Sequence, residues 1–159
     1  MSESLSHVGP EGKARMVDVS GKPVTLRTAR AAGQIRMARA TLDAIQANTL
    51  KKGDVLGVAR VAGVMAAKRT AELIPLCHPL PLDDLQVTLT PDPDLPGIRA
   101  EATARSTGRT GVEMEAIVAV TMALVTVYDM AKAGDREMVI GEVLLVEKTG
   151  GQRGDWARG

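Results

Sequence analysis

The sequence predicts an α+β sandwich, in which helices cover one face of an antiparallel sheet. Four segments have the patterns or composition of strands, and one uncharged stretch has the composition of a buried helix. The order along the chain is strand, two helices, two strands, helix, strand. With one helix set aside, this is the split β-α-β pattern of ferredoxin-like folds. We therefore expect a four-stranded antiparallel sheet with helices on one face and an extra helix. A partner subunit would cover the other face.

Composition limits the classes of function. The chain has 159 residues, which is most simply one domain and is long enough to bury a core. Hydrophobic residues make up 45% of the chain, but Phe is absent and aromatic residues total 1%, so the core must be aliphatic. The shortage of rings argues against modules that stack nucleic-acid bases. The net charge of +1 creates no global field that favours nucleic acid or a membrane.

The termini and the single cysteine suggest where the protein works. Cys77 is the only cysteine, so no internal disulfide is possible and a reducing compartment is expected. The N-terminal residues lack the apolar core of a signal peptide, which favours a cytoplasmic protein. We expect residues 1–15 to be disordered, residues 16–151 to form a single domain, and residues 152–159 to be a flexible tail.

The first half of the chain contains one strand and two helices by prediction. Val24–Met37 should be a strand, with an interruption near Gly33. Ala38–Asn48 has helical composition. Asp54 is placed to cap a second helix, which Pro75 ends. We expect the inward residues of that second helix to be Val55, Val58, Ala62, Met65 and Ala66.

The second half contains the other three strands. Leu85–Leu89 alternates as a half-buried strand does. Ile98–Arg105 alternates again, which puts Ile98, Ala100, Ala102 and Ala104 on one face. The last strand should be Met138–Lys148.

The stretch Ser106–Asp135 holds the helix around which the rest is organised. No residue from Ala116 to Tyr128 is charged, so most of this helix should be buried. The uncharged run is shorter than the roughly 20 apolar residues that cross a bilayer. Thr110 stands three residues before Glu113, which is the pattern of a capping box.

One stripe of this helix carries a carboxylate near each end. At about 100° per residue, the stripe contains Glu115, Ala119, Met122, Thr126 and Asp129. The two carboxylates are separated by about 21 Å, because 14 residues rise about 1.5 Å each. Small side chains lie between them and permit close approach of another element. Two copies packed antiparallel about a two-fold axis would bring Glu115 of one near Asp129 of the other.

The segment Leu76–Pro79 allows two interpretations. Its backbone should be extended before the proline, so Cys77 and His78 point to opposite sides and do not form a nucleophile–base pair. Metal binding is poorly supported, because only His7 and His78 accompany the single cysteine. The segment is then either a rigid connection that holds a small buried thiol or a loop that presents His78 to a ligand.

Charged residues elsewhere also have two interpretations. Asp129 and Lys132 are three residues apart and are therefore neighbours on a helix. They are either a simple ion pair at the end of the helix or a proton-transfer pair whose pKa values are shifted by partial burial. Several cations are either solvated surface or a convergent anion pocket: Arg27, Lys51, Lys52, Lys68, Arg69 and Lys148. The Gly108–Gly111 turn is too short for a Walker motif and lacks its Gly-Lys ending.

Several of these stretches resemble the MoaC family, the cyclic pyranopterin monophosphate synthases of molybdenum cofactor biosynthesis. The resemblance extends from about Met16 to Gly151. It is carried by Met16–Ser20, Lys52–Val55, Ala66–Thr70, Leu73–Leu80 (LIPLCHPL), Thr110–Ala116 (TGVEMEA), and Tyr128–Met130 followed by Lys132. Motifs as long as LIPLCHPL and TGVEMEA together are highly specific.

The resemblance implies a ferredoxin-like subunit with one catalytic domain. It also implies a homohexamer, built as a trimer of dimers, with sites at subunit interfaces. The substrate would be a cyclised dihydro-GTP, and the products cyclic pyranopterin monophosphate and pyrophosphate. By the family pattern the catalytic residues are Asp129, Lys132 and Lys52. The residues that bind substrate would be Leu76, Cys77, His78, Met114 and Glu115, with Arg27, Lys68 and Lys148 on the phosphates.

No redox step is implied, so we expect no flavin, haem or nicotinamide cofactor and no metal site in the protein. Magnesium is expected only as a companion of the triphosphate. The alternative to an enzyme is a non-catalytic regulatory module of ferredoxin-like fold that binds a nucleotide. It would explain the fold and the cations equally well, but it leaves the spacing of Asp129 and Lys132 as a coincidence.

Overall fold

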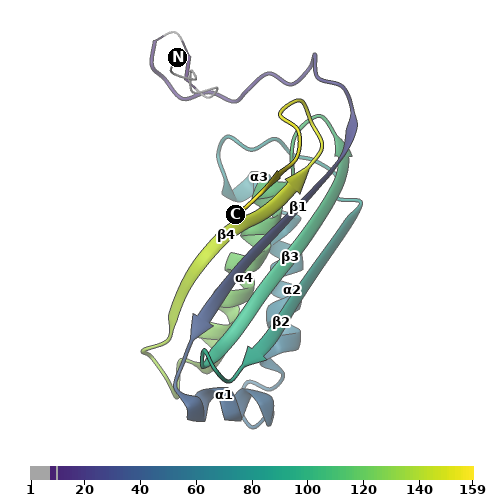
Figure 1. The fold of residues 1–159 in the computed structure, drawn as a ribbon. Coiled ribbons are helices and arrows are strands. Elements are labelled where there is room, and N and C mark those ends of the chain that lie inside the picture. The colour runs from purple at the N-terminus through teal and green to yellow at the C-terminus, as the bar shows by residue number, and fades with distance from the viewer. Residues whose placement is uncertain (1–7, 10) are drawn as a thin grey trace.

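The strands form one antiparallel sheet, in the order β2-β3-β1-β4-β5 (Figure 1). The structure is a computed structural model that describes residues 8, 9 and 11–159. Its elements are β1 (Thr25–Arg36), α1 (Arg39–Gln46), α2 (Val55–Ala67), α3 (Thr70–Leu73), β2 (Asp84–Asp92), β3 (Gly97–Gly108), α4 (Glu113–Ala131), β4 (Val139–Thr149) and β5 (Trp156–Ala157).

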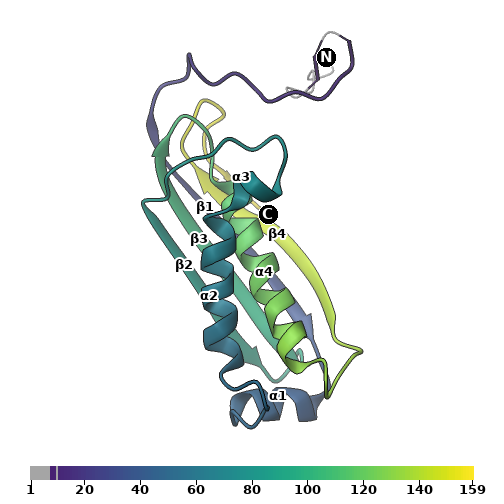
Figure 2. The same cartoon turned by 180° about the vertical axis from the view of Figure 1, so that it is seen from behind.

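The helices α2 and α4 cover one face of the sheet, and α1 lies across one end of it (Figure 2). The four long strands and the helices on one face confirm the predicted α+β sandwich. The order of those strands, with the two hairpin-connected strands β2 and β3 beside β1, is that of a ferredoxin-like fold.

The predicted interruption near Gly33 is a local change of pairing and not a break in the strand. β1 pairs with β3 along its whole length, while its register against β4 shifts between Ala32 and Gln34. Gly33 itself faces α4. A Cβ atom there would lie 2.8 Å from Val120 Cγ1 and 3.0 Å from Leu124 Cδ1. The missing side chain lets the helix lie close to the sheet.

The core is aliphatic, as the composition predicts. The alternating residues Ile98, Ala100, Ala102 and Ala104 of β3 are all at most 1% exposed. The cluster of buried core residues contains no aromatic ring. Because so many of these side chains are alanines, the helical layer can approach the sheet closely without leaving gaps.

The start of α2 agrees with the prediction, but its end does not. The Asp54 side chain accepts a hydrogen bond of 2.9 Å from the Gly57 amide and caps the helix. The helix then ends at Ala67, well before Pro75, and the chain between them makes the short helix α3.

The inward face of α2 was predicted correctly at Val55 and Ala66 but incorrectly at Val58, Ala62 and Met65. Val58 and Met65 are 47% and 52% exposed, and the buried residues are Val55, Ala59, Gly63, Ala66 and Ala67. The reason lies at Gly63, where an added Cβ would be 2.8 Å from the Ala119 carbonyl oxygen of α4. Two helices this close can place only small residues between them, so the larger apolar side chains point outward.

The predicted capping box at the start of α4 is also absent. The N-cap residue is Val112, and no side chain caps the helix. Glu113 turns instead to Lys148 of β4, at 3.0 Å. The Glu113 carboxylate, which the capping box requires, is instead paired with the ammonium group of Lys148 in β4.

Most of the N-terminal segment lies outside the described residues, whereas the C-terminal tail is part of the sheet. The disorder predicted for residues 1–15 falls mainly on residues 1–7 and 10, which lie outside the described residues. The tail expected to be flexible instead forms β5, which pairs with β4. The Arg158 amide donates to the Val146 carbonyl at 2.8 Å, and the Gly150 amide donates to Asp155 Oδ1 at 2.9 Å. These bonds hold the tail against the sheet.

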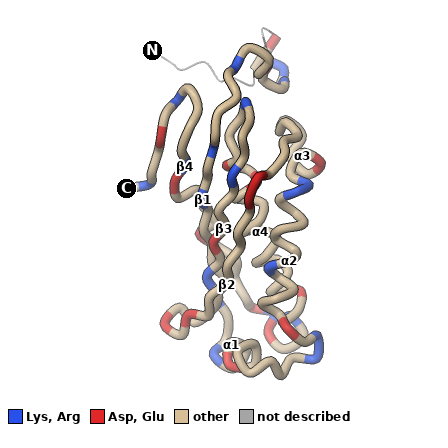
Figure 3. Tube along the Cα trace, turned by 90° about the vertical axis from the view of Figure 1, so that its right-hand side faces the viewer, with Lys and Arg blue, Asp and Glu red and all other residues tan. Residues whose placement is uncertain are grey.

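α4 is a core helix of the fold. Its 19 residues are long and apolar enough to span a membrane by length and composition alone. Most of its course is without charge (Figure 3). However, Ala119, Val120 and Leu124 are fully buried against the sheet and α2, as a core helix requires.

Candidate active site

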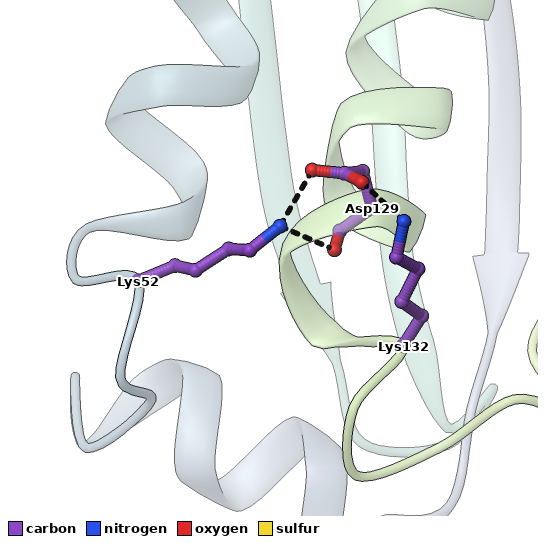
Figure 4. A network of polar contacts seen from close by, with 3 residues as sticks. All are labelled: Lys52, Asp129 and Lys132. Atoms are coloured by element: carbon purple, nitrogen blue, oxygen red, sulfur yellow. Dashed lines mark hydrogen bonds and ion pairs between the residues drawn. The ribbon is translucent and has the colours of Figure 1, made fainter.

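A carboxylate and two ammonium groups meet at the C-terminal end of α4 (Figure 4). Asp129 lies in the last turn of the helix, and Lys132 is its C-cap residue. Lys132 Nζ is 2.6 Å from Asp129 Oδ1, and Lys52 Nζ is 2.8 Å from Oδ2. Lys52 also donates to the Asp129 backbone carbonyl, at 3.1 Å. We call Lys52, Asp129 and Lys132 the trio.

The loop between α1 and α2 supplies Lys52. Gly53 has φ = +82°, a conformation that glycine adopts without strain, and it turns the chain from Lys52 into the Asp54 cap. The capped helix α2 then packs along α4, which places Lys52 beside Asp129. The spacing of the sequence indicated only the pair of Asp129 and Lys132. It carried no sign of the contact with Lys52, which is 77 residues away.

Hydrogen bonding lowers the pKa of Asp129 from its ordinary 3.8 to about 2, chiefly through Lys132 and then through Lys52. About half of each side chain in the trio is exposed, so burial is not the cause. Because the pKa is lower in the folded protein, this carboxylate favours folding above about pH 4. That contribution is lost as the pH falls towards 2.

A cavity of about 380 Å³ lies at the other end of α4. It contains seven of the eight residues predicted to bind substrate: Arg27, Leu76, Cys77, His78, Met114, Glu115 and Lys148. The eighth, Lys68, is the exposed C-cap residue of α2 and does not line the cavity. The structure therefore gathers most of the predicted binding set and leaves Lys68 apart from it.

The cavity contains buried groups of both signs. Arg27 is 8% exposed and donates to the carbonyl oxygens of Gly108 and Arg109, at 3.3 and 3.2 Å. Glu115 is 5% exposed, and burial raises the pKa of its carboxyl group. Burial also raises the pKa of the Cys77 thiol, which disfavours a reactive thiolate.

Sequence reasoning missed several residues of the cavity wall. Val17, Val19 and Lys22 come from the segment before β1, and Arg153 comes from the loop before β5. Val17 and Val19 had a signal, because the Met16–Ser20 motif was part of the family resemblance, but Lys22 lies outside that motif. Arg153 had none, since a glycine-rich tail reads as a flexible end.

The trio and the cavity do not meet within one chain. Glu115 and Asp129 are both in α4, 14 residues apart, which is about 21 Å along the helix axis. None of the trio lines the cavity. One chain therefore carries two separate groups of candidate site residues. Within the part of the chain that the structure describes, no cluster of three or more His, Cys, Asp or Glu side chains is arranged to hold a metal.

Known proteins match this chain along nearly its whole length. The sequence model of the MoaC family matches residues 16–151. The chain is 57% identical over 155 residues to the cyclic pyranopterin monophosphate synthase of Nostoc sp., which covers 98% of this chain and 92% of that protein. It is 54% identical over 157 residues to the proteins of that name from Brucella ovis and Brucella melitensis biotype 2, with 99% of this chain and 95% of each relative covered. With both the family match and this level of identity, the chain belongs to the MoaC family.

Proposed function

We propose that this protein is a cyclic pyranopterin monophosphate synthase. It converts the cyclised dihydro-GTP intermediate to cyclic pyranopterin monophosphate and releases pyrophosphate. Family membership supports the reaction, and the relatives at 57% and 54% identity carry this name. The observation that carries the assignment in this chain is the trio, in which one carboxylate accepts hydrogen bonds from two lysines.

The trio suits the ring chemistry. Opening a purine-derived ring and closing it as a pterin requires protons to be moved between nitrogen, carbon and oxygen atoms. Asp129 is ionised at neutral pH because its pKa is about 2, and it can accept a proton only from a strong acid or in concert with a lysine. The two ammonium groups are the proton donors of the trio. We assign proton transfer to Asp129 and Lys132, with Lys52 completing the catalytic set.

The cavity suits the phosphates. Closing the cyclic phosphate expels pyrophosphate, and cations must stabilise the charge that grows on the leaving group. Arg27 and Lys148 line the cavity, and we assign them to the phosphates. The purine-derived part would contact Leu76–His78, Met114 and Glu115. Magnesium would enter as part of the triphosphate substrate.

We further propose that a complete site is shared between two chains of a hexamer, a trimer of dimers in the cytoplasm. Within one chain, the trio and the cavity are about 21 Å apart along α4. Ala119, which was predicted to let a second copy of the helix approach, is fully buried against α2, so the contact cannot form at that stripe. Two copies packed antiparallel through the outer side of the helical layer would instead bring the trio of one chain to the cavity of its partner. The outer side of the helical layer offers apolar surface for such a contact, with Val58, Met65 and Val125 each more than 40% exposed.

The rival function is a regulatory module that binds the nucleotide without reacting. The cavity and its cations fit that function as well. That function leaves the trio without a role, because an exposed carboxylate held by two lysines contributes little to stability.

Purified protein incubated with the cyclised dihydro-GTP should produce the pterin and one pyrophosphate per turnover. The pterin is measured by fluorescence after oxidation, and the pyrophosphate by a coupled assay. Binding of the substrate without release of pyrophosphate would favour the regulatory module instead.

Mixed oligomers test the shared site. A mixture of Lys52→Ala and Asp129→Ala chains could restore activity only if the two residues came from different chains, but they form an ion pair within one chain. That pair should therefore fail to restore activity and serves as the control. Asp129→Ala mixed with Lys148→Ala should succeed, because a mixed dimer contains one site with neither change.

With random 1:1 mixing, half of the dimers are mixed and half of their sites are intact, so activity should reach about a quarter of wild type. The mixed oligomers are verified by two affinity tags before assay. Equal and negligible activity in both mixtures would place the complete site within one chain.

A further inference from the structure

The Glu113–Lys148 ion pair lies inside the cavity that we assign to the substrate. Glu113 Oε1 is 3.0 Å from Lys148 Nζ, with 27% and 25% of the two side chains exposed. Both residues line the cavity. The chain thus supplies its own anionic partner to a cation that is placed to bind a phosphate.

The other cations of the cavity lack such a partner. Lys22, Arg27 and Arg153 also line it, and none of them forms an ion pair with a described residue. Arg27 donates only to backbone carbonyl oxygens. Among the described residues, Lys148 is therefore the cavity cation whose charge is matched by a carboxylate.

The position of Glu113 at the start of α4 also stabilises its negative charge. Glu113 is the first residue of α4, where the free amides and the helix dipole favour a negative charge. Its carboxylate also lies against Gly111, at a point that a Cβ atom of that residue would fill. A carboxylate displaced from Lys148 would still lie at this N-terminus, which would stabilise part of its charge.

We propose that Glu113 is an internal competitor for the phosphate position, whose carboxylate gives up Lys148 to a phosphate group and takes it back when pyrophosphate leaves. The inference rests on the proposed function for the identity of the anion. A phosphate carries more charge than a carboxylate and wins the ammonium group when bound. Recapture of Lys148 by Glu113 then weakens the hold of the cavity on the pyrophosphate and speeds its release.

The test measures binding of inorganic pyrophosphate by calorimetry, without any reaction. Glu113→Gln should lower the Kd for pyrophosphate by about five- to tenfold, because it removes a half-buried competing charge. In a Lys148→Met background the same change should have much less effect. Inhibition of turnover by pyrophosphate should become stronger in Glu113→Gln by a similar factor.

The control is Glu101→Gln, which also removes one negative charge from an ion pair, but on the opposite face of the sheet next to Arg30. It should leave the Kd unchanged. A folded Glu113→Gln protein that binds pyrophosphate no more tightly than wild type would overturn the proposal, as would equal tightening in Glu101→Gln. Failure of wild type to bind pyrophosphate at all would also overturn it.

The outcome is separable from that of the proposed function. If the protein makes the pterin but Glu113→Gln does not bind pyrophosphate more tightly, only the competitor role is wrong. If the binding results are as expected but no pterin forms, only the assigned reaction is wrong.

Discussion

Replacing Asp129 with asparagine should reduce product formation by about 10²–10⁴-fold, the range over which a positioned acid or base contributes. The amide is nearly the same size, but its nitrogen is a donor, so it loses the hydrogen bond from one of the two lysines, and it cannot accept a proton. The fold should be unaffected, because the trio is half exposed and exposed ion pairs contribute little to stability. Initial rates with the cyclised dihydro-GTP and thermal unfolding of the same samples measure the two effects separately.

The matched control is Asp43→Asn. Asp43 forms an exposed helical ion pair with Arg39, at 3.7 Å, but it contacts neither the trio nor the cavity. Its activity should stay within about twofold of wild type. An Asp129→Asn protein with near-normal rates would mean that the carboxylate does not transfer protons and that the trio is structural.

Leu124→Ala should lower the free energy of unfolding by about 2–5 kcal/mol, the usual cost of a large-to-small change in a core. Leu124 is fully buried at the centre of α4, against β1. Leu73→Ala is the control, since Leu73 is also in a helix but is 51% exposed, and it should cost far less. Denaturant unfolding at one fixed protein concentration measures both, because an oligomer's stability depends on concentration.

The close contact with Gly33 gives this prediction a second test. A Cβ at Gly33 would be 3.0 Å from Leu124 Cδ1, so Gly33→Ala should be destabilising in the wild type. In the Leu124→Ala background one of these close contacts is removed, so the cost should fall in part, while the contact with Val120 Cγ1 at 2.8 Å remains. Strictly additive effects would show that the two positions do not share this space.

The parts of the fold that could be predicted are those in which apolar and polar residues follow a regular pattern along the sequence. β3 alternates apolar and polar residues from Ile98 to Arg105, so its buried face follows directly from the period of two. The same method failed for α2, because apolar residues occur on nearly every side of that helix. Only the contact of Gly63 with α4 decides which of them point inward, and that contact is tertiary.

The candidate site was predictable where its residues are close in sequence. Asp129 and Lys132 are three apart on one helix, and Leu76–His78 is a continuous segment. The link from Lys52 to Asp129 and the pair of Glu113 with Lys148 depend on how distant elements pack, so no local spacing reveals them. The tail was misjudged for the same reason, since its strand forms only through pairing with β4.

The approach of α2 to α4 at Gly63 has a consequence for how the trio works. A Cβ atom on Gly63 would lie 2.8 Å from the Ala119 carbonyl oxygen, so the missing side chain lets the two helices pack closely at this point and restrains where they meet. Lys52, just before α2, is thereby set opposite Asp129 before any substrate arrives. In the proposed reaction the charges of the trio would then need little rearrangement to reach the transition state, and a glycine far from the chemistry would contribute to their alignment.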